Sequence, residues 1–399
     1  MLVFFLLNLA RITQAEVLPF NCHVKHSRPV AWDVDCSSRN LQVLPKTLEN
    51  QPIVNFTLRN NMFKNVSFSA WVNLKYLDIS FNQVNAFHKS MLSGVKNLNF
   101  LNISYNTLRN IYPDNFEGLE HLKTLDISGN FLLKNEESVY QAINKTLYNG
   151  LRRLYAKSLG LSDFPINIFD HASELEILDL KYNNITFLPI FPPNLRVLDL
   201  SSNNLKELKM HPFHMATNLR ELIIEDNKYL TTIDHDAFRH TKHLERISLR
   251  GSIRLDYLPK PLFFHLPLKS LSLARCNFTT LHPYFKHQFV QLEFLDLRGN
   301  PWECNASIRW FTRLDGPLAK EIRCFTPRNV SIDSYFGMKM SHIVLGNLLA
   351  LLMGLLLIFF GLGLWFALDL EKKSRLSHMY SPLEKNVVQT RPVYVSTVC

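Results

Sequence analysis

The chain has 399 residues, of which 47% are hydrophobic and 20% are charged, and its formal net charge at pH 7 is +10. The basic residues are spread along the sequence and form no basic run interleaved with aromatic residues, which argues against nucleic-acid binding. Length alone would allow two or three domains, but a repeat that fills most of the sequence indicates one elongated domain.

Residues 1–15, MLVFFLLNLARITQA, predict a secretory signal peptide. Its apolar run is followed by a small-residue cleavage site that ends at Ala15. We therefore expect the chain to enter the secretory pathway, where disulfides can form. The next segment, residues 16–52, contains Cys22 and Cys36, and we interpret it as a cap in front of the first repeat.

The pattern L-x-x-L-x-L-x-x-N recurs through residues 53–300. In LEILDLKYN it is formed by Leu175, Leu178, Leu180 and Asn183. Six of the ten intervals between the eleven copies are 24 residues long, and a period of this length is typical of a solenoid. The copies begin at Ile53, Leu74, Leu98, Leu122, Leu151, Leu175, Leu195, Leu219, Leu244, Leu268 and Leu292.

Alternation and hydrogen bonding explain the pattern. Leu178 and Leu180 alternate as in a β-strand, so both are predicted to face the core while Asp179 points to solvent. An Asn amide carries donors and acceptors, so a buried Asn183 can bond to the backbone groups of neighbouring turns. We therefore predict a structural ladder of Asn side chains. It should be weaker where another residue replaces Asn, at Leu159, Ser252 and Cys276.

Two features lie outside the predicted strands. A Phe recurs in the outer half of the repeats and predicts a buried aromatic spine. Its members are Phe116, Phe169, Phe213, Phe238, Phe264 and Phe285. The repeat that begins at Leu122 has 29 residues, and its excess lies near LLKNEESVYQAINKTLYNG. We interpret this excess as a bulge or short helix on one flank, and the alternative is a functional loop.

The repeats and the cysteines beside them resemble the extracellular leucine-rich-repeat family of single-pass receptors, over residues 22 to about 335. The ectodomain is similar to that of Toll-like receptors. The resemblance implies an α/β leucine-rich-repeat solenoid that is curved and has short parallel strands on its concave face. It also implies disulfide caps that cover the open ends of the core.

Those caps imply two bridges, Cys22–Cys36 and Cys304–Cys324. The second bridge belongs to a C-terminal cap and juxtamembrane segment at residues 301–341. The family often has a further Cys where this chain has Ala306, so the resemblance implies one bridge here rather than two. Cys276, at a ladder position, is expected to be a free and buried thiol.

Residues 343–368 are apolar and uncharged, and as a helix they are long enough to cross a hydrocarbon core of ~30 Å. Lys372 and Lys373 follow, which predicts a cytoplasmic C-terminus by the positive-inside rule. We therefore expect a single-pass type I protein of the plasma membrane, with a disordered cytoplasmic tail at residues 369–399. This tail is too short for the signalling domain of Toll-like receptors.

Shorter motifs agree with this topology. Eight N-glycosylation sequons precede the predicted span and none follows it. They lie at Asn55, Asn65, Asn102, Asn144, Asn184, Asn277, Asn305 and Asn329. Small and polar residues share one face of the predicted membrane helix, where we expect lateral association, although Asn347 could instead lie near the outer headgroups. These residues are Asn347, Ala350, Gly354 and Gly361. Tyr380 and Leu383 fit Y-x-x-Φ, the form of an endocytic sorting signal that also arises by chance.

The sequence contains no motif of a known catalytic centre. H-E-x-x-H, G-x-S-x-G and glycine-rich phosphate loops are missing. His211 and His214 have a metal-like spacing, as do His240 and His243, but no Cys or carboxylate set accompanies them, so we interpret them as solvated surface residues. An Asp recurs in the predicted strands and matches a family consensus residue. We expect no enzymatic activity, metal or cofactor.

The predicted binding surface is the inner face of the middle and C-terminal repeats. Glycans on Asn55 and Asn102, within predicted strands, would cover the N-terminal part of that face. Tyr and Arg dominate many interfaces, and we predict contact through Tyr155, Lys157, Lys181, Tyr182, Glu225, Arg250, Arg275 and Arg298. Such residues suit an acidic or sulfated partner. The alternative is a solvated face whose long side chains are spread at random.

Fold class does not decide function. The resemblance favours a cell-surface receptor or adhesion protein that recognises a protein or glycoprotein partner. Two alternatives stand beside it. One is an accessory or decoy co-receptor that presents a Toll-type ectodomain in innate immunity, and the other is an auxiliary subunit of a membrane channel.

Overall fold

The computed structural model describes most of the chain, and two predicted segments lie outside the described residues. These are residues 1–15, the signal peptide, and residues 380–399, which hold the Tyr380 and Leu383 motif. The described ranges are 22–28, 31–49, 51–133, 135–260, 262–314, 319–326 and 329–379. The chain divides into two units, Met1–Asp333, here called the repeat domain, and Ser334–Cys399.

A 13-stranded sheet runs through the repeat domain, with its strands in chain order. It starts with β1 (His23–Arg28), which is antiparallel to β2 (Ala31–Asp35). Every later strand of this sheet is parallel to its neighbours. Each predicted repeat contributes one strand: β3 (Ile53–Thr57), β4 (Tyr76–Asp78), β5 (Phe100–Asn102), β6 (Thr124–Asp126), β7 (Arg153–Tyr155), β8 (Ile177–Asp179), β9 (Val197–Asp199), β11 (Glu221–Ile223), β13 (Arg246–Ser248), β14 (Ser270–Ser272) and β15 (Phe294–Asp296).

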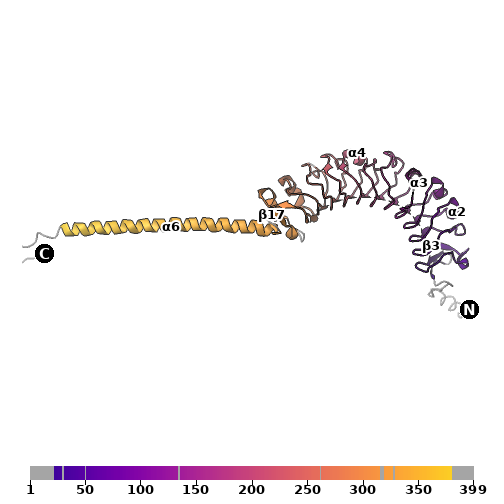
Figure 1. The fold of residues 1–399 in the computed structure, drawn as a ribbon, viewed down its shortest axis with the longest axis horizontal. Coiled ribbons are helices and arrows are strands. Elements are labelled where there is room, and N and C mark those ends of the chain that lie inside the picture. Colours follow the sequence, from indigo (N-terminus) through magenta and orange to yellow (C-terminus); the bar gives the residue numbers. More distant parts are fainter. Residues whose placement is uncertain are drawn as a thin grey trace, which may run out of the picture. The chain divides into compact units, whose positions relative to one another are not determined.

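The repeat domain is an arc with the strands on its inner side (Figure 1). Register is constant from β3 to β15: Leu178 of β8 pairs with Leu154 and with Leu198, and all three side chains are fully buried. Short elements form the outer half of the repeats. They are η1 (Lys46–Leu48), α2 (Lys89–Leu92), η2 (Pro113–Phe116), β10 (Glu207–Leu208), α4 (Met210–Phe213), β12 (Thr232–Ile233), η3 (Pro283–Phe285) and α5 (Lys286–Phe289). The predicted leucine-rich-repeat solenoid is confirmed.

The Asn ladder is present and bonds as predicted. Asn183 donates from Nδ2 to the carbonyl oxygens of Ala156 at 2.9 Å and Leu180 at 2.8 Å. Its Oδ1 accepts from the backbone N–H groups of Leu159 and Leu161, both at 3.1 Å. Because these backbone groups are buried, each bond avoids the cost of an unpaired polar group.

The ladder weakens where Asn is replaced. Ser252 Oγ is buried without a hydrogen-bond partner. Cys276 Sγ lies 3.2 Å from the carbonyl oxygen of Leu249, which is a weaker bond than an amide would form. Leu159 is buried and offers no polar side-chain atom. Apolar packing therefore holds these turns with less help from side-chain hydrogen bonds.

The aromatic spine is also present, with one correction. Phe169, Phe191 and Phe213 follow one another at centroid distances of 6.0 and 5.7 Å. The prediction that Phe264 belongs to the spine is wrong. Phe264 is 65% exposed, and Phe263 is fully buried in its place. A spine Phe normally stands six residues before the next repeat, as Phe213 does before Leu219, and Phe263 is nearer to that spacing than Phe264 is.

The excess residues of the fourth repeat form a helix, as one predicted alternative held. Helix α3 (Glu136–Tyr148) starts at Asn135, whose side chain accepts a bond from the backbone N–H of Ser138. Val139 and Ile143 lie on the inner face of α3 and are buried. Figure 1 shows α3 on the outer side of the arc.

Both ends of the sheet are closed by the disulfides that the resemblance implied. Cys22–Cys36 links the start of β1 to the end of β2. Cys304–Cys324 links β16 (Trp302–Glu303) to its parallel partner β17 (Cys324–Thr326). Two 3₁₀ helices complete the C-terminal cap, η4 (Ala306–Arg313) and η5 (Ala319–Glu321). Cys276 is a buried free thiol.

Helix α6 (Ile332–Met379) contains one segment, Val344–Leu370, that is long and apolar enough to cross a membrane. The helix is longer than the predicted span at residues 343–368. Residues 369–379, predicted as the start of a disordered tail, are helical, because Leu, Glu, Lys and Arg are good helix formers and no Gly or Pro interrupts them. The face predicted for lateral association, which includes Asn347 and Gly354, lies on this helix.

Candidate functional site

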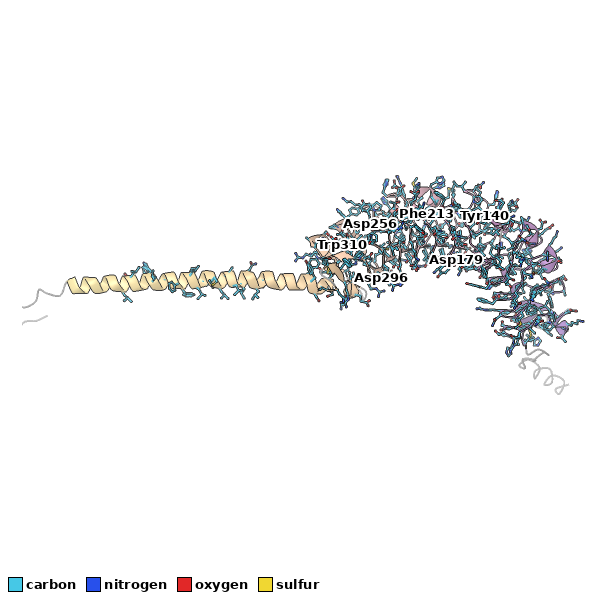
Figure 2. The ribbon with its side chains drawn as sticks, in the orientation of Figure 1. Tyr140, Asp179, Phe213, Asp256, Asp296 and Trp310 are labelled. Atoms are coloured by element: carbon cyan, nitrogen blue, oxygen red, sulfur yellow. A yellow bond between two sulfur atoms is a disulfide. The ribbon has the colours of Figure 1, made fainter. Side chains whose placement is uncertain are left out.

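Each strand presents two side chains on the concave face, one on either side of a buried residue. On β8 these are Ile177 and Asp179, which flank Leu178. Figure 2 shows Asp179 and Asp296 toward the inner side of the arc, and Tyr140 and Phe213 toward the outer side. Ligands that bind the concave face therefore meet the outward strand residues and the turn that follows them.

The recurring Asp residues of this face have a structural role. Asp179 Oδ1 accepts from the backbone N–H of Lys181 at 3.2 Å, and the equivalent bond is present at Asp78, Asp126, Asp199 and Asp296. Burial raises the pKa of Asp126, and it also raises the pKa of Asp179 although Lys157 lies 3.1 Å away. Each of these carboxylates thus accepts a hydrogen bond from a backbone N–H group of the turn that follows its strand.

The predicted contact residues of the middle repeats divide into paired and free groups. Lys157 forms an ion pair with Asp179 and lies 5.7 Å from the ring centroid of Tyr155. Lys181 lies over the ring of Tyr182 at 5.0 Å, and Tyr182 is 56% exposed. Tyr182 is therefore the exposed member of this group, whereas Lys157 and Lys181 are both half-buried.

The predicted residues of the C-terminal repeats divide in the same way. Arg298 pairs with Asp296 at 2.9 Å and with Glu321 at 2.7 Å, so it joins the last strand to the C-terminal cap. Glu225 accepts a bond from Ser248 Oγ at 2.6 Å. Arg250 and Arg275 are exposed, and among the described residues neither forms an ion pair.

A hollow opens in the concave face between β13 and β15, and the sequence did not predict it. We call it the serine hollow. Its volume is ≈ 230 Å³, and its lining includes Glu225, Arg246, Arg250, Ser270, Ser272 and Phe294. Ser270 and Ser272 occupy both outward positions of β14. Ser270 lies between Arg246 and Phe294, and Ser272 lies between Ser248 and Asp296. Two small residues in one repeat are the signal that could have revealed the hollow.

The wall of the serine hollow combines charge with an aromatic surface. Arg246 pairs with Glu221 at 2.9 Å, which leaves Arg250 as the lining cation without an ion pair among the described residues. Phe294 is 46% exposed. The hollow thus offers a cation, hydroxyl groups and a ring face in one place.

Aromatic residues dominate the N-terminal end of the concave face, also unpredicted. Tyr76 and Phe100 stack with centroids 4.2 Å apart, and Phe81 and Tyr105 stack at 4.4 Å. The guanidinium of Arg59 lies 4.7 Å from the Phe81 centroid. Phe81 and Tyr105 hold positive φ angles of 54° and 51°, which non-glycine residues rarely adopt.

One histidine of each predicted pair contacts a backbone carbonyl oxygen. His214 Nδ1 lies 2.6 Å from the carbonyl oxygen of His211, and His243 Nδ1 lies 2.9 Å from that of Thr217. Within the described ranges no group of three or more His, Cys, Asp or Glu side chains could hold a metal ion.

Comparisons with known proteins agree with this architecture. Residues 72–132 and 193–255 match the model of the family described as Leucine rich repeat. Human (Homo sapiens) oligodendrocyte-myelin glycoprotein is 27% identical over 54% of this chain and 42% of its own length. Mouse (Mus musculus) podocan is 34% identical over 28% of this chain and 19% of its own length.

The chain therefore spans less than half the length of these two relatives. The crystal structure of an internalin from Listeria monocytogenes shares the fold, with a TM-score of 0.57 over 74% of this chain and 79% of that chain at 16% identity. The repeats, the parallel sheet, the capping disulfides and these similarities support an extracellular, receptor-like leucine-rich-repeat family.

Proposed function

We propose that this chain is a cell-surface receptor or adhesion protein whose concave face binds a protein or glycoprotein partner over the fifth to eleventh repeats. The serine hollow carries the proposal. Its volume of ≈ 230 Å³ is below the ~300–1,000 Å³ of pockets that enclose a small-molecule ligand. It therefore suits one side chain or one sugar of a larger partner.

We infer that an acidic or sulfated group binds at Arg250, in a hollow whose lining also carries the carboxylates of Glu221, Glu225 and Asp296. Arg250 can pair with a carboxylate or sulfate, Ser270 and Ser272 can donate hydrogen bonds to it, and Phe294 can pack against the apolar part of the same residue. Arg and aromatic residues often dominate interface energies. Binding that depends on Arg250 should weaken as salt rises.

The predicted contact residues contribute unequally to this proposal. Lys157 and Arg298 are neutralised by carboxylates, so they hold the sheet and the cap rather than a partner. Lys181, Tyr182 and Arg275 have free surface beside or between the repeats that hold the hollow. We propose these three with Arg250 as the principal contacts.

The proposal has the repeat domain outside the cell, α6 in the plasma membrane and the residues after it in the cytoplasm. The apolar segment Val344–Leu370 supports one span. Six sequon asparagines are exposed, while Asn55 and Asn102 are half-buried. The face of Asn347 and Gly354 would then be available for lateral association, and Tyr380 with Leu383 for sorting.

Proximity labelling on living cells that display the full chain tests the proposal. Ser270→Tyr fills the hollow, Arg250→Glu reverses its free charge, and Lys242→Glu changes an exposed charge in the outer half of a repeat as the control. A partner should be labelled by the wild-type chain and the control but not by the two hollow variants. Equal labelling by all four chains would refute the concave site.

The partner identified by this experiment also separates the alternatives. An accessory or decoy co-receptor would label another innate immune receptor or its ligand, and an auxiliary subunit would label a channel. Digestion with an N-glycan-removing enzyme on the same cells tests the topology, because an unchanged electrophoretic mobility would contradict an extracellular repeat domain.

A further inference from the structure

A predicted glycosylation site lies beside a stacked aromatic pair on the concave face of the second and third repeats. Tyr76 on β4 and Phe100 on β5 are register partners, with ring centroids 4.2 Å apart and planes inclined by 9°. Asn102 follows Phe100 by two residues on the same strand, so both side chains emerge on the same face. Both rings are half-exposed and present apolar surface beside the sequon.

The amide of Asn102 is held in place while its nitrogen stays free. Its Oδ1 accepts from the backbone N–H of Ser104 at 3.0 Å, and Nδ2 has no partner among the described residues. Asn55, the other sequon in a strand, differs. Its Nδ2 donates to Asp33 Oδ1 at 2.6 Å, toward β2, whereas Tyr76 lies on the opposite neighbour, β4.

We propose that an N-glycan on Asn102 lays its first N-acetylglucosamine ring over the Tyr76–Phe100 pair. The inference rests on the extracellular location given under the proposed function. Attachment forms a bond from Asn102 Nδ2 to the anomeric carbon of an oligosaccharide carried on a lipid diphosphate. The amide loses one proton and the lipid diphosphate leaves. The hydrogen bond from Ser104 to Oδ1 is kept.

A pyranose ring fits this surface for two physical reasons. Its axial C–H groups carry partial positive charge and can meet the negative face of Phe100 that is turned away from Tyr76. Asp126, the register partner of Asn102 on β6, offers a carboxylate that can accept from the acetamido N–H or a hydroxyl of the sugar. The glycan would then be a fixed part of the N-terminal concave face, and the serine hollow would remain open to a partner.

The test uses sequon variants that leave the amide intact. Ser104→Ala removes the sequon but keeps Asn102 and its bond to the backbone N–H of residue 104. Ser80→Ala changes the equivalent position of the preceding repeat, where no sequon is present, and Thr57→Ala removes the Asn55 sequon on the same face. Phe100→Leu removes the ring while keeping an apolar strand residue.

The full chain, made in secretory cells and purified in detergent, is compared by thermal unfolding, with site occupancy measured by mass spectrometry. Ser104→Ala should lower Tm by about 2 °C in the wild-type background and by much less when combined with Phe100→Leu. Ser80→Ala and Thr57→Ala should lower Tm less than Ser104→Ala does.

Two results would overturn the inference. One is an equal Tm loss from Ser104→Ala with and without Phe100, and the other is a glycan-free Asn102 in a chain whose other sequons are occupied. A chain with every sequon bare would contradict the extracellular location itself, so this failure is distinguishable from the other two.

Discussion

The two ends of the concave face carry different chemistry on the same backbone. In the first four repeats aromatic rings stack on one another, as Tyr76 does on Phe100. In the last four, arginines pair with carboxylates around the serine hollow, as Arg246 does with Glu221. Strand register is constant from β3 to β15, so the outward side chains create the difference. A solenoid can therefore vary its surface while the buried Leu and Asn positions preserve its stability.

The largest expected contrast between the ends concerns the Asn ladder. Asn106→Ala removes the bonds from Nδ2 to the carbonyl oxygens of Ile79 and Ile103 and the bond from the Val84 N–H. These groups are buried, so the free energy of unfolding should fall by about 3 kcal/mol. Ser252→Ala should change it by less than about 1 kcal/mol, because the Ser252 hydroxyl has no partner. Denaturant unfolding monitored by circular dichroism measures both, and equal losses would contradict a ladder that is weaker at Ser252 than at Asn106.

A contrast of intermediate size concerns two glycines that close equivalent turns at positive φ. A Cβ on Gly129 would lie 2.6 Å from Cδ1 of Tyr105, whose ring is held by its stack on Phe81. A Cβ on Gly299 would lie 3.0 Å from Cγ of Arg275, a flexible side chain that can move. We expect Gly129→Ala to cost about 2 kcal/mol and Gly299→Ala about 1 kcal/mol, the second being mainly backbone strain. Thermal unfolding of both variants checks the order, which would be reversed if the N-terminal aromatic stack were mobile.

The smallest expected contrast is between two aspartates whose ionisation changes the free energy of unfolding in opposite directions. This contrast depends on pH. Burial raises the pKa of Asp126, so its charged form destabilises the fold at neutral pH. Burial also acts on Asp296, but the hydrogen bonds from Arg298 outweigh it and hold the pKa of Asp296 below its usual value. At pH 7, Asp126→Asn should therefore raise the free energy of unfolding and Asp296→Asn should lower it, each by less than about 1 kcal/mol.

Both differences should shrink as the pH falls. Asp126 is protonated in both states once the pH is below its unfolded pKa of ~3.9, so the gain from Asp126→Asn disappears there. The stability supplied by ionised Asp296 is lost as the pH falls through its depressed folded pKa. Unfolding curves between pH 7 and pH 3 measure both trends, and the same sign for the two variants at pH 7 would contradict the assignment.

Much of the fold could be predicted because each buried position repeats under the same constraint. Leu178, Asn183 and Phe213 recur with nearly constant spacing, and their burial follows from that spacing. Phe264 was mispredicted where the spacing changes, beside Pro267. The positive-inside signal marks a membrane boundary and not the end of a helix, so the sequence did not predict that α6 continues to Met379.

The candidate site was less predictable, because outward positions can be identified from alternation but their partners cannot. Lys157 and Arg298 have the residue types of interface contacts, yet each pairs with a carboxylate on another repeat or on the cap. Ser270 and Ser272 are ordinary as residue types, and they form the floor of a hollow because larger residues such as Arg246 and Phe294 lie on the neighbouring strands. The function of this face thus depends on contacts between side chains of different repeats rather than on the residues of any one repeat.

The buried thiol of Cys276 can be used to measure how often the weakest stretch of the ladder opens. Burial raises the pKa of its thiol to about 12, so in the closed repeat the group is both shielded and protonated, and it does not attack the cap disulfides. Reaction with a thiol-specific alkylating agent then requires the tenth repeat to open. The rate of alkylation in native buffer would measure how often the tenth repeat opens. It would therefore report the local stability of this end of the solenoid without any denaturant.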